Sequence, residues 1–466
     1  MHKILLPFLL ALVLSGCMMG PDYRRPTVEA PKSWRFEEKE AQEISNAAWW
    51  KQFNDPVLNE LIQVALKENK DLKIATARVE EFMGLYGTTR ANMFPQVYGS
   101  ASAGRSRVSD YEYKITSAAE NPSNNVTILL NGSWELDLWG KLRRGTEAAR
   151  ANLLSQEEGR ISVILTLVTS VASAYVNLCN LDRQLDIARL TTQNRKESYD
   201  LFQLRFRGGV VSELELSQVK SEYEQTLATI PVLEKAITQQ ENALSVLLGQ
   251  NPGSIPRGKK IDDLVLPIVP AGLPSALLAN RPDIRQAEQN LIAANAKIGV
   301  AKTLYFPTIS LTGSYGASSN DLSNLFTGPA NVWSWAVPLA TPIFTGGAIS
   351  GQIKSTEAQQ QQTLFRYQQT IQTAFREVED ALIDQRRSRE ELEIQDRQIE
   401  SLWNYARIAR LRFDQGYTSY IEVLDAERNL FNAELSRAQS KGVLFQALVN
   451  LYKAMGGGWT IESSEK

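Results

Sequence analysis

Residues 126–138 read VTILLNGSWELDL, a stretch in which apolar and mostly polar side chains alternate. Successive residues of a β-strand point to opposite faces of the sheet, so the alternation predicts a strand with one apolar and one polar face. A transmembrane strand, with lipid on one side and water on the other, has this pattern. The apolar face comprises Val126, Ile128, Leu130, Gly132, Trp134, Leu136 and Leu138, and the opposite face Thr127, Leu129, Asn131, Ser133, Glu135 and Asp137.

Three further stretches alternate in the same way, after Pro95, after Pro307 and from Trp333 onward. We therefore predict four strands, over residues 93–108, 126–139, 306–319 and 330–344. Their aromatic residues fit the girdles that mark the lipid–water interfaces of membrane barrels. These residues are Tyr98, Trp134, Trp139, Tyr315, Trp333 and Trp335. A soluble β-sandwich with one buried face is the alternative.

Four strands are too few to close a barrel, because about eight is the practical minimum. An open sheet in lipid would leave unpaired backbone groups at both edges, at a cost of several kcal/mol each. The chain is therefore expected to close the sheet with copies of itself. Three copies would give about 3 × 4 = 12 strands, which is wide enough to enclose a water-filled lumen.

The chain also contains an internal duplication. RFRGG at residues 205–209 recurs as RFDQG at residues 412–416, an offset of 416 − 209 = 207 residues. Each copy reads as a helix, two strands, a long helix, a turn and a second long helix. Apolar residues recur every seven positions in the helices that follow both turns, which indicates coiled-coil packing. At about 1.5 Å per residue the longest predicted helices would reach roughly 100 Å, as in a duct or rod.

These patterns give the following predicted organisation. Residues 1–16 form a signal peptide and residues 17–60 an N-terminal segment. The first repeat covers residues 61–260, with helices over 61–91, 141–206 and 212–248. The second repeat covers residues 261–456, with helices over 283–304, 349–413 and 419–455, and a tail follows over 457–466. Pro231 is expected to bend or locally open its helix.

The N-terminus indicates export. A short basic start precedes an apolar run of about eleven residues, too short to span a bilayer and typical of a signal peptide. The run ends in Leu14-Ser15-Gly16-Cys17, which resembles the lipobox of bacterial lipoproteins and implies that Cys17 is acylated. An ordinary signal peptide that contains a cysteine is the alternative. No later stretch offers 18 consecutive apolar residues, so no transmembrane helix is expected after processing.

Composition argues against several functions. The net charge of −2 does not suggest a nucleic-acid partner. His2 is the only histidine and would be removed with the signal peptide, so common Ser-His and Cys-His nucleophile systems are not expected. Cys179 reads as a packing residue in an apolar helix. No phosphate-binding loop or metal-ligand spacing is apparent. We therefore predict no catalytic residues, no bound metal and no cofactor.

Several motifs occur together and in order: the lipobox, GPDYRRP at residues 20–26, Trp49-Trp50, both Phe-Pro strand starts, ELDLWGK at 135–141, RPDI at 281–284 and IEVLDA at 421–426. Together they resemble the outer membrane factor (TolC) family, in its lipid-anchored OprM-like branch. The resemblance covers nearly the whole mature chain. It implies a mixed α+β homotrimer whose 12-stranded barrel continues into a long periplasmic α-helical barrel, surrounded by an equatorial region that includes residues 17–60. The implied partners are outer-membrane lipid, a periplasmic adaptor and an inner-membrane pump of the RND or ABC type.

The resemblance also assigns roles at the two turns between long helices. It places a periplasmic gate there, lined by acidic residues that correspond to Glu422 and Asp425, with Glu215 at the partner position of the first repeat. Rings of carboxylates favour cations. The candidates for adaptor docking are Arg205, Gly208, Gly209, Arg412 and Gly416, although the glycines are equally consistent with simple helix capping. An arginine that ties neighbouring helices in the family is Thr418 here, for which Arg410 or Arg412 is a possible substitute.

These observations favour a passive outer-membrane exit duct for small toxic molecules or drugs. Two alternatives remain at this point: the outer-membrane component of type I protein secretion, and a coiled-coil structural lipoprotein without a pore. An enzyme that uses a carboxylate pair is disfavoured, because the acidic residues lie on repetitive helices with no cleft-forming context. The sequence leaves the cargo open among drugs, metals, solvents and proteins.

Overall fold

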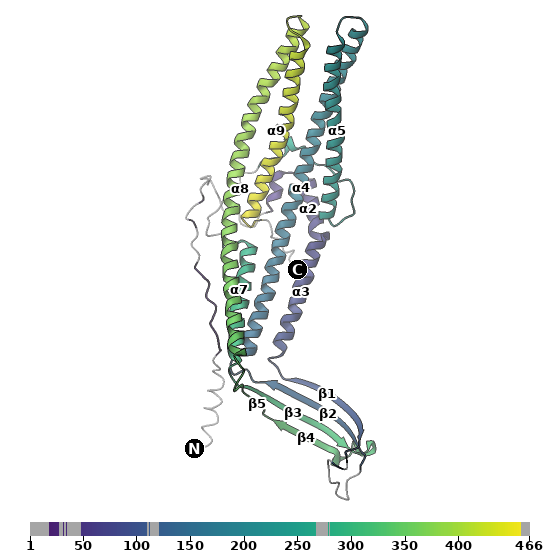
Figure 1. Ribbon diagram of the computed structural model, residues 1–466. Coiled ribbons are helices and arrows are strands. Elements are labelled where there is room, and N and C mark those ends of the chain that lie inside the picture. Colours follow the sequence, from purple (N-terminus) through teal and green to yellow (C-terminus); the bar gives the residue numbers. More distant parts are fainter. Residues whose placement is uncertain are drawn as a thin grey trace. The chain divides into compact units, whose positions relative to one another are not determined.

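The structure is a computed structural model that describes residues 18–27, 31, 34, 48–109, 111, 121–266, 278 and 280–457. Over these residues the chain is mostly helical, with one five-stranded sheet (Figure 1). It divides into a strand unit (residues 1–27, 78–156 and 286–367) and a helical unit (residues 28–77, 157–285 and 368–466). The predicted signal peptide, Cys17 and almost all of the predicted tail lie outside the described residues.

The sheet of the strand unit is antiparallel, in the order β1-β2-β3-β4. Strand β1 spans Gln96–Ser106, β2 Ser123–Glu135, β3 Thr308–Ser319 and β4 Asn331–Ala336. The short strand β5, Leu339–Ala340, pairs with β3 beyond the end of β4. Strands from the two halves of the sequence thus meet where β2 pairs with β3, and β1 and β4 are the outer strands.

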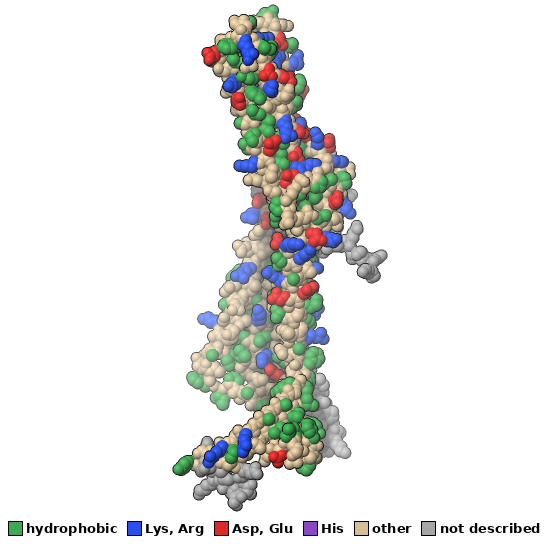
Figure 2. Space-filling model, turned by 90° about the vertical axis from the view of Figure 1, so that its right-hand side faces the viewer, with side chains coloured by type: hydrophobic (Ala, Val, Ile, Leu, Met, Phe, Trp, Pro, Cys, Tyr) green, Lys and Arg blue, Asp and Glu red, His purple; other side chains and the backbone are tan. Residues whose placement is uncertain are grey.

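The register separates the sheet into two faces. On one face Leu130 stands between Gly99 and Tyr315, and Tyr315 in turn faces Trp333. On the other face Asn131 stands between Tyr98 and Ser314, and polar side chains bond across the strands, as Asn131 does with the Ser100 hydroxyl. The apolar face is uncovered by the rest of the described chain: Leu130 is 58% exposed and Trp333 69%. Figure 2 shows hydrophobic side chains gathered over these strands. A sandwich with this face buried is therefore wrong.

Two of the predicted girdle residues lie elsewhere. Tyr98 pairs with Asn131 and so belongs to the polar face, because its position in the strand is offset by one from Val97. Trp139 lies beyond the end of β2, where its ring stacks on Phe306 and its indole N–H donates to the carbonyl of Pro307. Trp134, Tyr315, Trp333 and Trp335 share the apolar face as predicted.

The strand ends differ from the predicted ones for local reasons. Strand β2 ends at Glu135 because Asp137 caps the next helix, accepting hydrogen bonds from the N–H groups of Leu142 and Arg143. The predicted strand over 330–344 is interrupted between β4 and β5. Pro338 lies in the gap and has no N–H to donate, although its carbonyl still accepts from Ser310 of β3.

Four long helices carry the duplication. Helices α4 (Lys141–Arg207) and α8 (Ala348–Asp414) each contain 67 residues, and α5 (Glu213–Leu247) and α9 (Tyr420–Ala454) each contain 35. The shorter helices α3 (Lys70–Ala91) and α7 (Pro282–Thr303) both contain 22. Equal lengths in both halves show two copies of one unit. Pro231 lies inside α5, which continues on both sides of it, and the predicted bend or local opening stays a prediction.

The predicted single helix over residues 61–91 is two helices. Helix α2 covers Pro56–Glu68 and α3 begins at Lys70. Asn69 separates them because its side chain serves both neighbours: its amide oxygen accepts from Leu72 N–H and its amide nitrogen donates to Leu247 O. An asparagine that caps a following helix is favoured outside the helix rather than within it.

The N-terminal part of the helical unit is fixed by buried aromatic and polar contacts. The one-turn helix η1, Trp49–Phe53, packs its Trp49 ring on Tyr452 of α9 at 4.7 Å between centroids. Asp55 is fully buried and accepts hydrogen bonds from Val57 N–H, the Tyr175 hydroxyl and Lys259 N–H. Three further one-turn helices are η2 (Ile261–Asp263), η3 (Leu322–Asn324) and η4 (Gly328–Ala330).

One described helix, α4, is long and apolar enough in one window to cross a membrane by length and composition alone. Of that window, 56% is buried within the protein. Core helices of soluble proteins pass the same test, so the finding by itself is weak evidence for a membrane helix.

Candidate functional site

Both turns between long helices end in the same way. Gly209 and Gly416 have φ values of +73° and +78°, and each is followed by a residue whose N–H bonds back across the last turn, Val210 to Arg205 O and Tyr417 to Arg412 O. This arrangement is the Schellman motif, in which glycine occupies the left-handed position. The two glycines are therefore needed as helix caps, whatever else contacts them. Gly208 has ordinary backbone angles.

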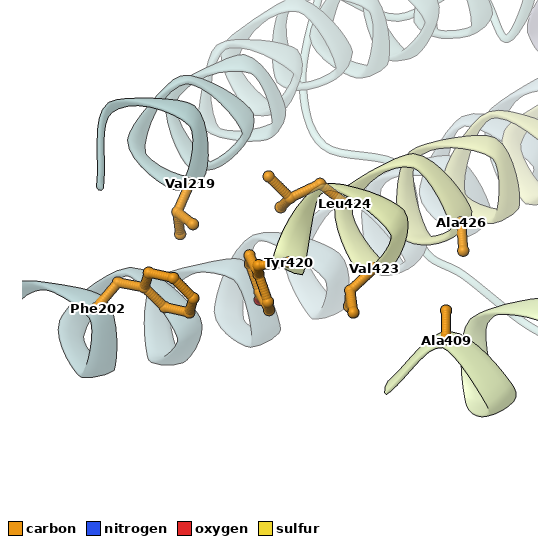
Figure 3. Packing of buried hydrophobic residues seen from close by; sticks show 7 residues of the cluster. All are labelled: Phe202, Val219, Ala409, Tyr420, Val423, Leu424 and Ala426. Carbon is orange, nitrogen blue, oxygen red and sulfur yellow. The ribbon is translucent and has the colours of Figure 1, made fainter. Parts of the chain in front are cut away.

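A hydrophobic cluster joins the helices behind the turns (Figure 3). Phe202 of α4 lies against Tyr420 of α9, with ring centroids 4.3 Å apart, and Val219 of α5 packs on the same cluster. The seven buried residues are Phe202, Val219, Ala409, Tyr420, Val423, Leu424 and Ala426. Arg205 lies over the rings of Phe202 and Phe413 at 5.7 and 5.9 Å from their centroids. The cluster fixes the first turns of α9 and with them the predicted gate acids.

Glu422 and Asp425 line one cavity of about 540 Å³, whose wall is formed by α5, α8 and α9. Its lining comprises Gln218, Ser221, Glu222, Tyr405, Ile421, Glu422, Leu424, Asp425 and Arg428. Glu422 lies 3.8 Å from Arg412, across the turn. Asp425 accepts a hydrogen bond from the Tyr405 hydroxyl at 3.3 Å and pairs with Arg428 at 2.6 Å. Partial burial and the neighbouring Asp425 carboxylate raise the pKa of Tyr405.

Glu215, the third predicted acid, takes part in a different structure. Its carboxylate accepts from Ser212 N–H at 2.8 Å, while the Ser212 hydroxyl accepts from Glu215 N–H. This capping box begins α5 and holds the pKa of Glu215 below its ordinary value. Glu215 is not among the residues that line the cavity, whereas Gln218, the repeat partner of Asp425 (425 − 218 = 207), is.

A charged group that we did not predict from the sequence connects the two helix pairs. Glu222 of α5 pairs with Arg195 of α4 at 2.8 Å and with Arg428 of α9 at 3.6 Å. Arg195 is 4% exposed, and burial lowers its pKa, an effect that the Glu222 carboxylate opposes. Arg428 also holds Asp425, so one arginine contacts both a predicted gate acid and the α4–α5 pair. The heptad spacing predicted that these residues lie on helices, but it did not predict which of them form ion pairs.

Arg410 and Arg412 make different contacts near Thr418. Arg410 of α8 donates to the Tyr420 hydroxyl at 3.2 Å and to the Ser198 hydroxyl of α4 at 3.5 Å, so it contacts both helix pairs. Arg412 lies 3.8 Å from Glu422, an ion pair that stays within the α8–α9 pair. Of the two substitutes considered for the missing family arginine, Arg410 therefore has the bridging geometry.

The turns also expose apolar side chains that occur in duplicate. Val210 and Tyr417 are each 75% exposed, and Leu214 and Ile421, one helical turn further on, are also exposed. Both pairs are separated by 207 residues (417 − 210 and 421 − 214). Exposed apolar residues that cluster at a site are typical of an interaction surface. The repeat offset would have identified them from the sequence.

A family model described as outer membrane efflux protein matches residues 61–250 and 273–457, once in each half of the chain. The chain belongs to this family. The cation efflux system protein CusC of Escherichia coli is 36% identical over 461 residues, which cover 98% of both chains. The solvent efflux pump outer membrane protein SrpC of Pseudomonas putida is 35% identical over 467 residues, which cover 98% of this chain and 99% of the relative.

Solved structures agree with the efflux-family fold. A crystal structure of CusC matches with a TM-score of 0.86 and 35% identity, covering 95% of this chain and all of that chain. The Campylobacter jejuni CmeC outer membrane channel matches with a TM-score of 0.89 and 27% identity, covering 97% of this chain and 96% of that chain. The protein is accordingly an outer-membrane efflux channel with two internal repeats, and the coiled-coil spacer without a pore is wrong.

Proposed function

We propose that three copies of this efflux channel form the exit duct of a tripartite pump, together with a periplasmic adaptor and an inner-membrane transporter that selects the cargo. The observation that supports this most directly is the sheet. It has one exposed apolar face, and its outer strands β1 and β4 each have one edge that no other described strand pairs with. Since neighbouring strands alternate in direction, β4 of one copy can pair antiparallel with β1 of the next.

Three copies would give a barrel of about twelve strands, lined by the polar face of each sheet. The same copies would bring three sets of Glu422 and Asp425 around one axis, as acidic rings that favour cations. In this proposal Glu215 caps α5 and has no gating role, whereas Glu222 joins the gate through Arg428. Cys17 is acylated and provides a second membrane attachment.

The adaptor is proposed to dock on the exposed apolar residues of the turns, beside Arg205, Gly208, Gly209, Arg412 and Gly416. Changing Gly209 or Gly416 would strain a left-handed backbone position. A loss of efflux in such a variant would therefore not distinguish lost docking from misfolding. Val210→Asp combined with Tyr417→Asp avoids this problem, because both side chains are exposed and neither residue has a positive φ.

We expect this double variant to lose efflux while the heat-labile assembly on a gel stays unchanged. Loss of a single anchor residue of an interface costs about 2 kcal/mol, or roughly thirtyfold in affinity. The measurement is drug or solvent tolerance of a strain that depends on this channel. Val232→Asp, at a residue 63% exposed on α5, is the matched control. Normal tolerance in the double variant would exclude docking at these residues.

Arg428 is proposed to hold the gate closed by bridging Asp425 and Glu222. Arg428→Met keeps much of the side-chain length and removes both ion pairs. A half-exposed pair of this kind contributes about 1 kcal/mol, so the closed state should weaken roughly fivefold per copy. Single-channel conductance in planar bilayers is expected to rise. Arg407→Met on α8 is the control, since Arg407 donates a hydrogen bond to Asn404 of its own helix. Equal conductance in the two variants would contradict the bridge.

A further inference from the structure

The segment that follows Cys17 lies along helices α4 and α7 of the strand unit, and we call Met18–Arg25 the N-terminal strap. Its backbone is held at Met19, whose N–H donates to Trp139 O at 3.1 Å, and at Pro21, whose carbonyl accepts from Asn295 at 2.8 Å. Its far end is held by Glu288 of α7, which accepts from the Tyr23 hydroxyl and pairs with Arg25. Burial and the Glu288 carboxylate raise the pKa of Tyr23.

Arg144, in the first turn of α4, lies at the centre of these contacts. Its side chain is 2% exposed, and it donates to Met19 O at 3.2 Å, to Gly20 O at 3.4 Å and to the Asp22 carboxylate at 2.7 Å. It also pairs with Glu147 of α4, at 2.8 Å. Within the described residues, three of the four hydrogen bonds of this guanidinium therefore go to the strap, and the fourth goes to Glu147. Without the strap, water would have to replace these three partners.

Close backbone packing makes the fit specific. A Cβ on Gly299 of α7 would lie 2.6 Å from Met19 O, and a Cβ on Gly20 would lie 2.4 Å from the Gly299 Cα. Gly20 also has a φ of +92°. At the start of the strap, a Cβ on Gly140 would lie 2.9 Å from the Met18 side chain. Glycine is therefore required on both sides of the contact, which brings the two backbones closer than any other residue would allow.

We propose that Arg144, Asn295, Glu288 and Gly299 form a peptide-binding site for the strap, and that this site fixes the acyl attachment point beside the junction of β2 and α4. The inference rests on the proposed acylation of Cys17. Met18 packs on Gly140, the residue before α4 begins, and consecutive Cα atoms are about 3.8 Å apart. The acyl chains therefore start at the end of the sheet from which β2 leads into α4, and the last pair of the apolar face toward that end is Trp134 with Leu311.

This placement gives the strap a function beyond tethering. If the acyl group were attached through a free linker, the sheet alone would determine how deep it lies in the membrane. A docked strap makes the lipid and the apolar face one rigid surface, so that both insert at a single depth. The site would recognise an extended peptide by its carbonyls, by the carboxylate of Asp22 and by the side chains of Tyr23 and Arg25.

The test releases the strap with one added methyl group. In Gly299→Ala the new Cβ would lie 2.6 Å from Met19 O and 2.8 Å from the Cγ of Arg144, so it meets both the strap and the arginine that holds it, while alanine favours the helix. Gly145→Ala on α4 is the matched control, since nothing lies within 4 Å of a Cβ there. A spin label on Arg24→Cys reports strap mobility in the full-length acylated protein in detergent. Cys17 is blocked by its lipid and Cys179 is buried, so the label is specific.

We expect the ratio of mobile to immobile label to rise at least about tenfold in Gly299→Ala and to stay unchanged in Gly145→Ala, since the loss of one charge-assisted hydrogen bond suffices for that factor. Asp22→Ala, which changes only an exposed strap residue, should act in the same direction. Identical spectra in Gly299→Ala, Asp22→Ala and the control would overturn the binding site.

The position of the lipid is tested separately with a photoreactive palmitate incorporated by growing cells. Illumination should join the Cys17 peptide to peptides that contain Trp134 or Leu311 in the wild type, and at least about tenfold less in Gly299→Ala, by the same estimate. Cross-links spread equally over the chain in both proteins would refute the fixed attachment point. The acylated mass of the N-terminal peptide shows independently whether Cys17 carries lipid, and neither readout depends on conduction.

Discussion

Leu130→Lys is expected to abolish assembly in the outer membrane, whereas Leu129→Lys, one residue away, is expected to be tolerated. Leu130 stands in the middle of the apolar face, between Gly99 and Tyr315, and is 58% exposed. A lysine at the bilayer midplane of a barrel costs about 2–4 kcal/mol, so three copies would lose roughly 6–12 kcal/mol. Leu129 belongs to the polar face, next to Ser100 and Gly316, where an ammonium group remains in water.

The measurement is the amount of heat-labile assembly in outer-membrane fractions, with the total amount of protein as the reference. The pair is closely matched, because both substitutions replace leucine with lysine on the same strand. Outer-membrane assembly of Leu130→Lys at the level of Leu129→Lys would show that the apolar face does not meet lipid, and with it the proposed barrel would fail.

Two sequence features made part of the structure predictable: the two-residue alternation of apolar and polar side chains, and the internal duplication. The alternation over 126–138 assigned Leu129 to the polar face despite its apolar side chain, because a strand has a strict period of two. The offset of 207 residues likewise predicted that the helices occur twice, and α4 and α8 have the same length. These features depend on many residues, so a single exception does not change them.

Contacts between residues far apart in the sequence were not predictable in this way. Asn69 separates α2 from α3 because its side chain also donates to Leu247 O. The sequence around Asn69 does not predict this partner, which lies 178 residues away. By the repeat offset, Glu215 is equivalent to Glu422. The structure separates the two residues, because Glu215 forms a capping box with Ser212. Ser419, at the matching position before α9, makes no side-chain cap hydrogen bond. The bridge from Arg428 to Glu222 depends on how α5 packs against α9, which periodicity does not determine.

Removing the two proposed gate acids is expected to have the second large effect. Glu422→Ala with Asp425→Ala should raise single-channel conductance and lower the preference for cations. A carboxylate about 10 Å from the axis attracts a cation in water by about 0.4 kcal/mol, so six carboxylates contribute about 2.5 kcal/mol before salt screening. Salt reduces this value, and we expect a roughly tenfold loss of cation-over-anion permeability. The measurement is conductance and reversal potential in planar bilayers under a salt gradient.

Two controls separate charge from structure in this experiment. Glu422→Gln with Asp425→Asn removes the same charges but keeps side chains that can still accept from Tyr405. It should lose selectivity as fully as the alanine pair while raising conductance less, because part of the closed geometry is retained. Glu393→Ala with Glu400→Ala removes two exposed acids from α8, outside the cavity lining, and should change neither quantity. If this distant pair lowered selectivity as much as the gate pair, selectivity would arise from the net charge of the helices, and Glu422 and Asp425 would have no special place in the gate.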